Sequence, residues 1–161
     1  MAASVPTSRL SNPLRLVPEL GPVAGALYKA VGNGAVPQGT IDLLQLRAGQ
    51  IVGNTYLTVM HTESLRKAGE AEERITAVAS WRDAPYFTAA EALALELVEA
   101  VLLPAAHGER VPDELYARVA AHYDEKALTT LVLAIGQVSF FVPLALVGKP
   151  LPGVKPSEQW T

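Results

Sequence analysis

The chain has 161 residues, 50% of them hydrophobic, which is enough for one globular domain with a sizeable core. Its net charge of −3, without a cluster of lysine or arginine, excludes a nucleic-acid backbone as the main partner. The sequence contains no cysteine, so disulfides, thiolate metal sites and thiol-based redox catalysis are excluded as well.

The first 17 residues contain prolines that discourage regular structure, so we expect an irregular arm whose leucines lie along a neighbouring surface. This start lacks the continuous apolar run of a signal peptide, and we expect a cytoplasmic protein. The first helix is expected over residues 18–31. Pro22 falls in its first turn, and Gly32 follows its end.

Two helices are expected next, over residues 37–53 and 54–68. Apolar residues at helical spacing give the first helix its core stripe: Ile41, Leu44, Ala48 and Ile51. Asn54 is a suitable N-cap for the second helix, and Gly69 ends it.

The remaining pattern is also helical. A short helix is expected over residues 70–83, and Thr88 and Glu91 form a capping-box pattern that opens a helix ending near Pro104. Further helices are expected from Pro112 and over residues 124–147, followed by an irregular tail over residues 148–161. No strand pattern of any length appears, so the fold class is all-α and residues 1–161 form a single domain.

One segment has the length of a membrane span, because residues 127–148 contain no charged side chain. Polar residues and Pro143 interrupt this run, and no other segment resembles it. We therefore expect a helix buried in the core or between subunits, and no membrane association.

Residues 47–69, RAGQIVGNTYLTVMHTESLRKAG, contain the most informative motif. Asn54, Leu57 and His61 follow the spacing C-x-x-C-x-x-x-H, with the two cysteines replaced. The stretch resembles the active-site helix of the carboxymuconolactone decarboxylase and alkylhydroperoxidase D-like family. The resemblance covers residues 38–103, including ASWRDAPYFTAAEALALELVEAV, which is similar to the family's Trp-Arg pair, short loop and capped helix.

The resemblance implies an all-helical subunit that forms a homo-oligomer, commonly a trimer or hexamer, with its site near a subunit interface. In the redox members of the family, a proton relay joins an acidic residue to the histidine. The positions that match the ends of this relay are Asp42 and His61. Both ends are thus present here, while the sulfur centre between them is missing.

Each candidate residue also has a purely structural interpretation. His61 is either a general acid or base or a buried structural histidine, since its ordinary pKa lies near neutrality. Asp42 either orients His61, or acts as a base itself, or is a carboxylate favoured at a helix start. Asn54 is either a donor to a substrate oxygen or a helix cap.

The remaining candidates for substrate binding are Tyr56, Leu57 and Trp81, although aromatic residues at helical positions more often belong to a core. No cofactor or metal is expected, because His107 and His122 do not have the spacing of helical zinc motifs.

Three functions are compatible with these residues. The first is a non-redox acid–base enzyme for a small organic substrate, which it decarboxylates, isomerises or deprotonates with His61. The second is a catalytically silent oligomeric binding or scaffold protein, favoured by the apolar Leu57. A peroxidase-related oxidoreductase without thiol chemistry is the weakest of the three, because no side chain here reduces a peroxide as a thiolate does.

Overall fold

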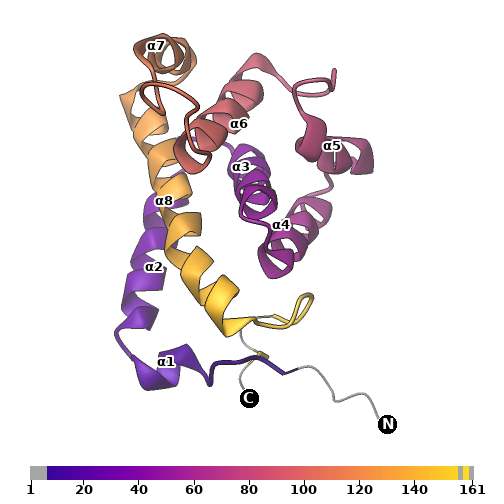
Figure 1. Ribbon diagram of the computed structural model, residues 1–161, viewed down its shortest axis with the longest axis vertical. Helices are drawn as coiled ribbons and strands as arrows, with labels where there is room; N and C mark the ends of the chain where they lie inside the picture. Colours follow the sequence, from indigo (N-terminus) through magenta and orange to yellow (C-terminus); the bar gives the residue numbers. More distant parts are fainter. Residues whose placement is uncertain (1–6, 156–157, 160–161) are drawn as a thin grey trace.

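The computed structural model describes residues 7–155 and 158–159, and all regular structure in this part of the chain is helical (Figure 1). The helices are α1 (Pro13–Leu16), α2 (Leu20–Val31), α3 (Gln38–Ile51), α4 (Thr55–Lys67), α5 (Glu72–Ala77), the 3₁₀ turn η1 (Val78–Ser80), α6 (Ala89–Leu102), α7 (Asp113–His122) and α8 (Glu125–Gly148). The expected all-α class is confirmed.

Helix α3 is the central element, and it packs against α4, α6 and α8. The stripe containing Ile41, Leu44 and Ala48 faces the larger core, as the spacing predicted. A second face, with Leu43 and Leu46, lies in a separate cluster with residues of α5, η1 and α6. Helix α3 is therefore buried on two sides, and its buried positions include the polar residues Thr40, Asp42 and Gln45 as well as the two apolar faces.

A close backbone approach joins α3 to α4. A Cβ atom added at Gly49 would lie 3.1 Å from the Thr58 nitrogen and 3.2 Å from the Leu57 Cβ. Such contacts are tighter than most Cβ atoms make, so a side chain at position 49 would displace its neighbours by a few tenths of an ångström, and the crossing favours glycine. The crossing fixes the rotation of α4 and therefore the direction in which its side chains point.

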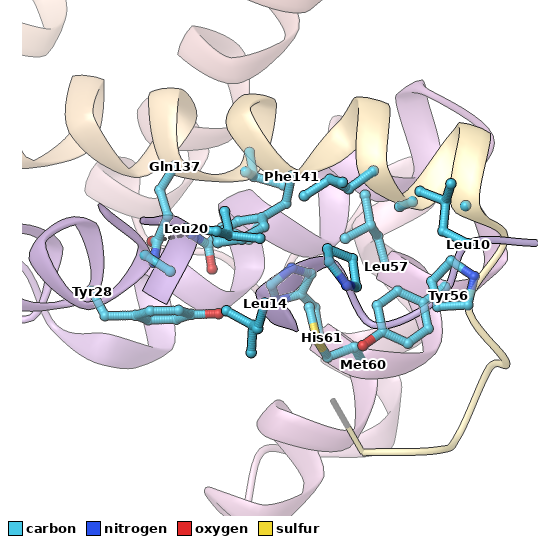
Figure 2. Close-up of a pocket in the computed structure, with 18 residues that line it drawn as sticks. Leu10, Leu14, Leu20, Tyr28, Tyr56, Leu57, Met60, His61, Gln137 and Phe141 are labelled. Atoms are coloured by element: carbon cyan, nitrogen blue, oxygen red, sulfur yellow. Dashed lines mark hydrogen bonds between the residues drawn. The ribbon is translucent and has the colours of Figure 1, made fainter. Parts of the chain in front are cut away.

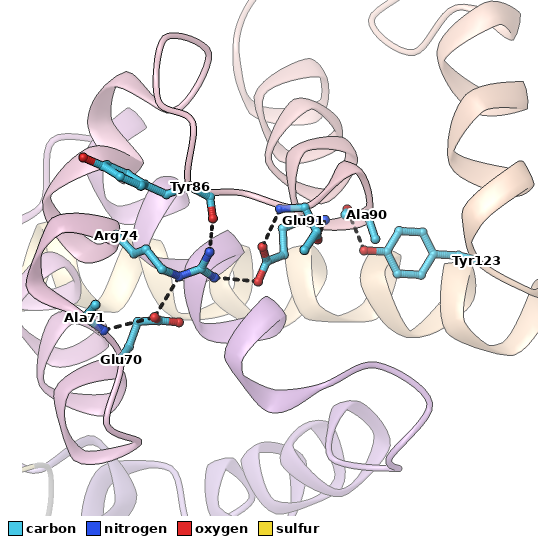
Figure 3. A network of polar contacts seen from close by, with 8 residues as sticks. Glu70, Ala71, Arg74, Tyr86, Ala90, Glu91 and Tyr123 are labelled. Atoms are coloured by element: carbon cyan, nitrogen blue, oxygen red, sulfur yellow. Dashed lines mark hydrogen bonds and ion pairs between the residues drawn. The ribbon is translucent and has the colours of Figure 1, made fainter.

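The expected helix over residues 70–83 is shorter than predicted, because α5 ends at Ala77 and tightens into η1. An arginine network anchors this region to α6 (Figure 3). Arg74 forms ion pairs with Glu70 at 2.8 Å and Glu91 at 2.7 Å, and it donates to the Tyr86 carbonyl. Glu91 also completes the predicted capping box with Thr88, which is confirmed.

Helix α8 begins after Asp124, whose side chain accepts from the Ala127 nitrogen at 2.8 Å. By length and composition this helix is able to span a membrane, as its sequence suggested. In the structure, however, it packs lengthwise against α2 and also contacts α3 and α7 (Figure 1). Buried positions such as Leu131, Ala134 and Val138 make it a core helix on one side.

The N-terminal segment is not irregular throughout, contrary to expectation. Asn12 caps the short helix α1, and Pro13 occupies its first turn, where the missing N–H of proline is tolerated. The preceding segment is bound to the end of α8, because the Arg9 nitrogen donates to the Gly148 carbonyl at 2.7 Å. Residues 1–6, 156–157 and 160–161 of the expected arm and tail lie outside the described residues.

Candidate functional site

The site is built on the first turn of α4. Gly53 has a positive φ of 67°, which turns the chain so that Asn54 can cap the helix. The Asn54 Oδ1 accepts from the Leu57 nitrogen at 2.9 Å, and the Thr58 hydroxyl donates to the Asn54 carbonyl at 2.9 Å. The side-chain oxygen of Asn54 is thus engaged in ordering the helix.

One turn further along, α4 forms a wall of a cavity of about 230 Å³ (Figure 2). The opposite walls come from α1, α2 and α8, and Gln45 of α3 completes the lining. The lining residues are Leu10, Pro13, Leu14, Leu20, Ala24, Tyr28, Gln45, Tyr56, Leu57, Met60, His61, Gln137, Val138, Phe141, Leu144, Ala145, Gly148 and Pro150. This lining includes no lysine, arginine, aspartate or glutamate, so the cavity is apolar with a few neutral polar groups.

His61 is the titratable group of this wall that matters near neutral pH. Its exposed fraction is 8%, and burial lowers its pKa from 6.5 to about 4. No hydrogen bond or ion pair to the imidazole occurs within the part of the chain that the structure describes. The ring is therefore neutral at pH 7 and borders the cavity, where it can accept a proton or hydrogen bond.

Of the other predicted substrate-binding residues, Tyr56 and Leu57 line the cavity beside His61. Leu57 is fully buried and belongs to the larger core. In the view of Figure 2, Tyr28 and Gln137 lie toward one end of the cavity and Tyr56 toward the other, with His61 and Met60 between them.

The predicted partner Asp42 does not line the cavity. Its Oδ1 accepts from Gln38 Nε2 at 3.1 Å, one helical turn away on α3. Burial raises the pKa of Asp42, and the hydrogen bond from Gln38 lowers it in part. No hydrogen bond or ion pair joins Asp42 to His61 among the described residues, so the structure brings the two ends of the expected relay into no direct contact.

Trp81 also lies away from the cavity, in the cluster between α3 and α6. Its indole Nε1 donates to Glu99 Oε1 at 2.8 Å. Glu99 additionally binds Arg47 at 2.8 Å and Arg82 at 2.7 Å. Burial raises the pKa of Glu99, but these donors outweigh it and hold the pKa below its ordinary value. Trp81 and Glu99 together tie η1 to α6.

Sequence reasoning missed the cavity residues outside α4, notably Tyr28, Gln45 and Gln137. The two glutamines interrupt otherwise apolar helix faces, and this was the signal available for finding them. The predicted role of the N-terminal leucines is supported, since Leu10 and Leu14 cover the cavity. No group of side chains suitable for holding a metal ion occurs over residues 7–155 and 158–159.

Two bacterial proteins are similar to this chain in sequence. The chain is 36% identical to the uncharacterised protein YdfG of Bacillus subtilis over 125 residues, which are 77% of this chain and 83% of YdfG. It is 42% identical over 66 residues to the uncharacterised protein YnjA of Escherichia coli, a match that covers 41% of this chain and 35% of YnjA.

Solved structures share the fold. ATU0492 of Agrobacterium tumefaciens, described as a protein of unknown function and a candidate antioxidant defence protein AhpD, superposes with a TM-score of 0.81 at 27% identity, over 92% of this chain and all of that one. The debrominase Bmp8, in a complex with 2,3,4-tribromopyrrole, gives 0.76 at 16% identity, over 89% of this chain and 76% of Bmp8. The fold is thus that of an alkylhydroperoxidase D-like protein, in which α8 packs as a core helix on one side.

The family model for the carboxymuconolactone decarboxylase family matches residues 18–100, which include α2 to α5, most of α6 and the cavity-lining residues from Leu20 to His61. Together with the YdfG match, this agrees with the resemblance seen over residues 38–103. This cysteine-free chain therefore belongs to the carboxymuconolactone decarboxylase family.

Proposed function

We propose that this protein is a non-thiol acid–base enzyme that acts on a small, uncharged and largely apolar organic molecule, with His61 as the proton-accepting group. The observation that carries the proposal is the neutral imidazole of His61 on the wall of an apolar cavity. A volume of about 230 Å³ is ample for a substituted six-membered ring, since a cavity of about 150 Å³ takes up benzene.

The absence of charged side chains from the described lining of the cavity favours some of the reactions that the sequence left open over others. A carboxylate substrate would enter without a cation to pair with, because none of the lining side chains is basic other than the neutral His61. Burying an unpaired carboxylate is costly, so decarboxylation of an anionic acid is disfavoured. Proton abstraction next to a carbonyl, or an isomerisation that begins with it, is favoured instead.

The low pKa of His61 keeps the free imidazole in its neutral, proton-accepting form at pH 7. When His61 takes a proton from a neutral carbon acid, an imidazolium and an enolate form together, and their attraction is strong in a poorly solvated cavity. The product of the step is an ion pair with no net charge, so the attraction between its two charges offsets part of the penalty that keeps the free imidazole neutral. In Bmp8 the same fold holds a small aromatic ring, which supports a ligand of this size.

Hydrogen–deuterium exchange at carbon tests the proposal even while the natural substrate is unidentified. Small neutral ketones, such as cyclohexanone and phenylacetone, would be incubated with the protein in D₂O, and deuterium uptake beside the carbonyl followed by NMR. We expect uptake to exceed that in buffer and to fall to the buffer rate in His61→Gln. The matched control is His122→Gln, which alters an exposed histidine outside the cavity and should exchange like the wild type. Exchange at the buffer rate with wild type, or undiminished exchange with His61→Gln, contradicts the proposal.

One observation favours the catalytically silent alternative. Asn54 caps α4 and Leu57 fills the core, so both positions that match the family's cysteines have structural duties. A silent binding protein would still take up neutral ligands in the cavity, but His61→Gln would leave its function unchanged.

A further inference from the structure

The cavity contains a second polar feature that the proposed proton transfer does not use. Gln45 of α3 and Gln137 of α8 both line the cavity, and their exposed fractions are only 6% and 4%. The Gln45 Nε2 donates to Gln137 Oε1 at 2.9 Å and lies 3.4 Å from the Ala134 carbonyl. The two amides therefore form a fixed pair between two helices that meet across the core.

The hydrogen bonds within this pair leave one amide acceptor and the donors of the other amide without a partner in the described part of the chain. An amide offers two N–H donors and a carbonyl acceptor. Both donors of Gln45 face acceptors within the protein, and Gln137 Oε1 is occupied, so the Gln45 Oε1 acceptor and the Gln137 Nε2 donors remain. No partner for these atoms is found among the residues that the structure describes.

The position of these atoms follows from their burial. Among the described residues, every side-chain nitrogen or oxygen that is fully buried has a hydrogen-bond partner. The free atoms of Gln45 and Gln137 must therefore border accessible space, and for residues this deeply buried that space is the cavity that they line. Figure 2 shows Gln137 beside the cavity, away from His61 along its length.

From this arrangement we infer that the Gln45–Gln137 pair is a recognition subsite for an uncharged ligand group that carries a donor and an acceptor side by side, such as a carboxamide or lactam. The acceptor of one amide and the donor of the other match such a group. A ligand with an acceptor alone leaves Gln45 Oε1 unsatisfied, and an anion would face a carbonyl oxygen. The inference deepens the proposed function, on which it rests, by naming the substrate class.

The same argument assigns the two ends of the ligand. The carboxamide or lactam end lies at the glutamine pair, an apolar body fills the cavity between α4 and the walls formed by α1, α2 and α8, and the reacting carbon lies near His61. Gln45 and Gln137 are thus specificity-determining residues rather than catalytic ones. Discrimination by buried hydrogen-bonding groups is strong, because a ligand that lacks the matching group leaves them unpaired.

Four probes that share a phenyl ring test the subsite: benzamide, acetophenone and benzoate, which are of nearly the same size, and the smaller toluene. Acetophenone replaces the benzamide amino group by a methyl, benzoate replaces it by a charged oxygen, and toluene has no hydrogen-bonding group. Binding to the full chain would be measured by ligand-observed NMR titration. We expect benzamide to bind wild type about tenfold more tightly than acetophenone, as one buried hydrogen bond allows, with benzoate the weakest.

The test variant is Gln45→Met/Gln137→Met, which removes both amides while preserving side-chain length. Replacing both partners of a buried pair by apolar groups is often nearly neutral for folding. This variant should bind toluene at least as well as wild type and lose the preference for benzamide. Gln50→Met is the matched control, because Gln50 lies on the same helix outside the cavity and accepts from Arg47.

The outcomes separate this inference from the proposed function. If wild type binds toluene but shows no preference for benzamide, or if the double variant keeps that preference, the glutamine subsite is refuted and the apolar cavity stands. Tightest binding of benzoate refutes the requirement for an uncharged ligand. If no probe binds wild type, both the subsite and the small-molecule cavity are refuted.

Discussion

Stability as a function of pH gives the most direct check on the state of His61. The pKa of this imidazole is about 4 in the folded protein, against an ordinary value of 6.5. Above about pH 6.5, a histidine whose pKa is lowered in the folded protein is neutral in both states and does not reduce the free energy of unfolding. As the pH falls below that value, the unfolded chain takes up a proton that the folded protein resists, and stability is lost until about pH 4.

The size of the effect follows from linkage. Between about pH 7.5 and pH 5, a histidine with these two pKa values lowers the free energy of unfolding by about 2 kcal/mol. The carboxylates with lowered pKa values, Glu91, Glu96 and Glu99, lose their contribution only at lower pH. Asp42 acts in the opposite direction, since burial raises its pKa and acid favours its folded form.

Urea unfolding at the two pH values, in wild type and in His61→Gln, isolates the histidine because all other groups are shared. We expect wild type to lose about 2 kcal/mol more than the variant. His122→Gln, at an exposed position, should behave as wild type. Equal pH dependence of wild type and His61→Gln would show that the imidazole is solvated or paired, and would remove the basis for a neutral base in the cavity.

Three further predictions follow from the packing. Gly49→Ala should destabilise the fold by about 1–3 kcal/mol, measured by urea unfolding, because its methyl meets the backbone of Thr58 at 3.1 Å; an unchanged midpoint would contradict the close approach. Glu99→Gln should cost about 2 kcal/mol, since two arginines and a tryptophan lose a charged acceptor, and a cost below about 0.5 kcal/mol would contradict this role. The expected homo-oligomer, a trimer or hexamer, is checked by light scattering after size-exclusion chromatography; the exposed Phe140 and Val147 of α8 mark the expected contact, and a monomer would contradict it.

Local signals in the sequence predicted the fold well. Capping depends on residues three positions apart, so Asn54 and the pair of Thr88 and Glu91 defined two helix starts correctly. The second apolar face of α3 was less evident, because Leu43 and Leu46 are buried only when α5 and α6 fold back onto it. The tightening of α5 into η1 likewise depends on tertiary packing.

In the candidate site, too, the residues predicted from local sequence differ from those that tertiary packing brings in. His61, Tyr56 and Leu57 lie within one helical segment, so helical spacing alone brings them together. Gln45 and Gln137 are 92 residues apart, and their pairing depends on how α8 crosses α3. Asp42 shows the limit of spacing alone, because the rotation of α3 turns its carboxylate toward Gln38 rather than toward the cavity.

The energetics of His61 bear on whether the cavity has a function. A buried, neutral imidazole loses hydration, and here it gains no hydrogen bond from the described residues in return. The neighbouring position 57 shows that this helix accepts a leucine facing the same cavity. An apolar side chain at position 61 would fill the wall without the loss of stability in acid, so packing alone does not require histidine there. Residues that lower stability without a structural benefit occur most often at functional sites, and His61 is such a residue on the wall of a cavity of ligand size.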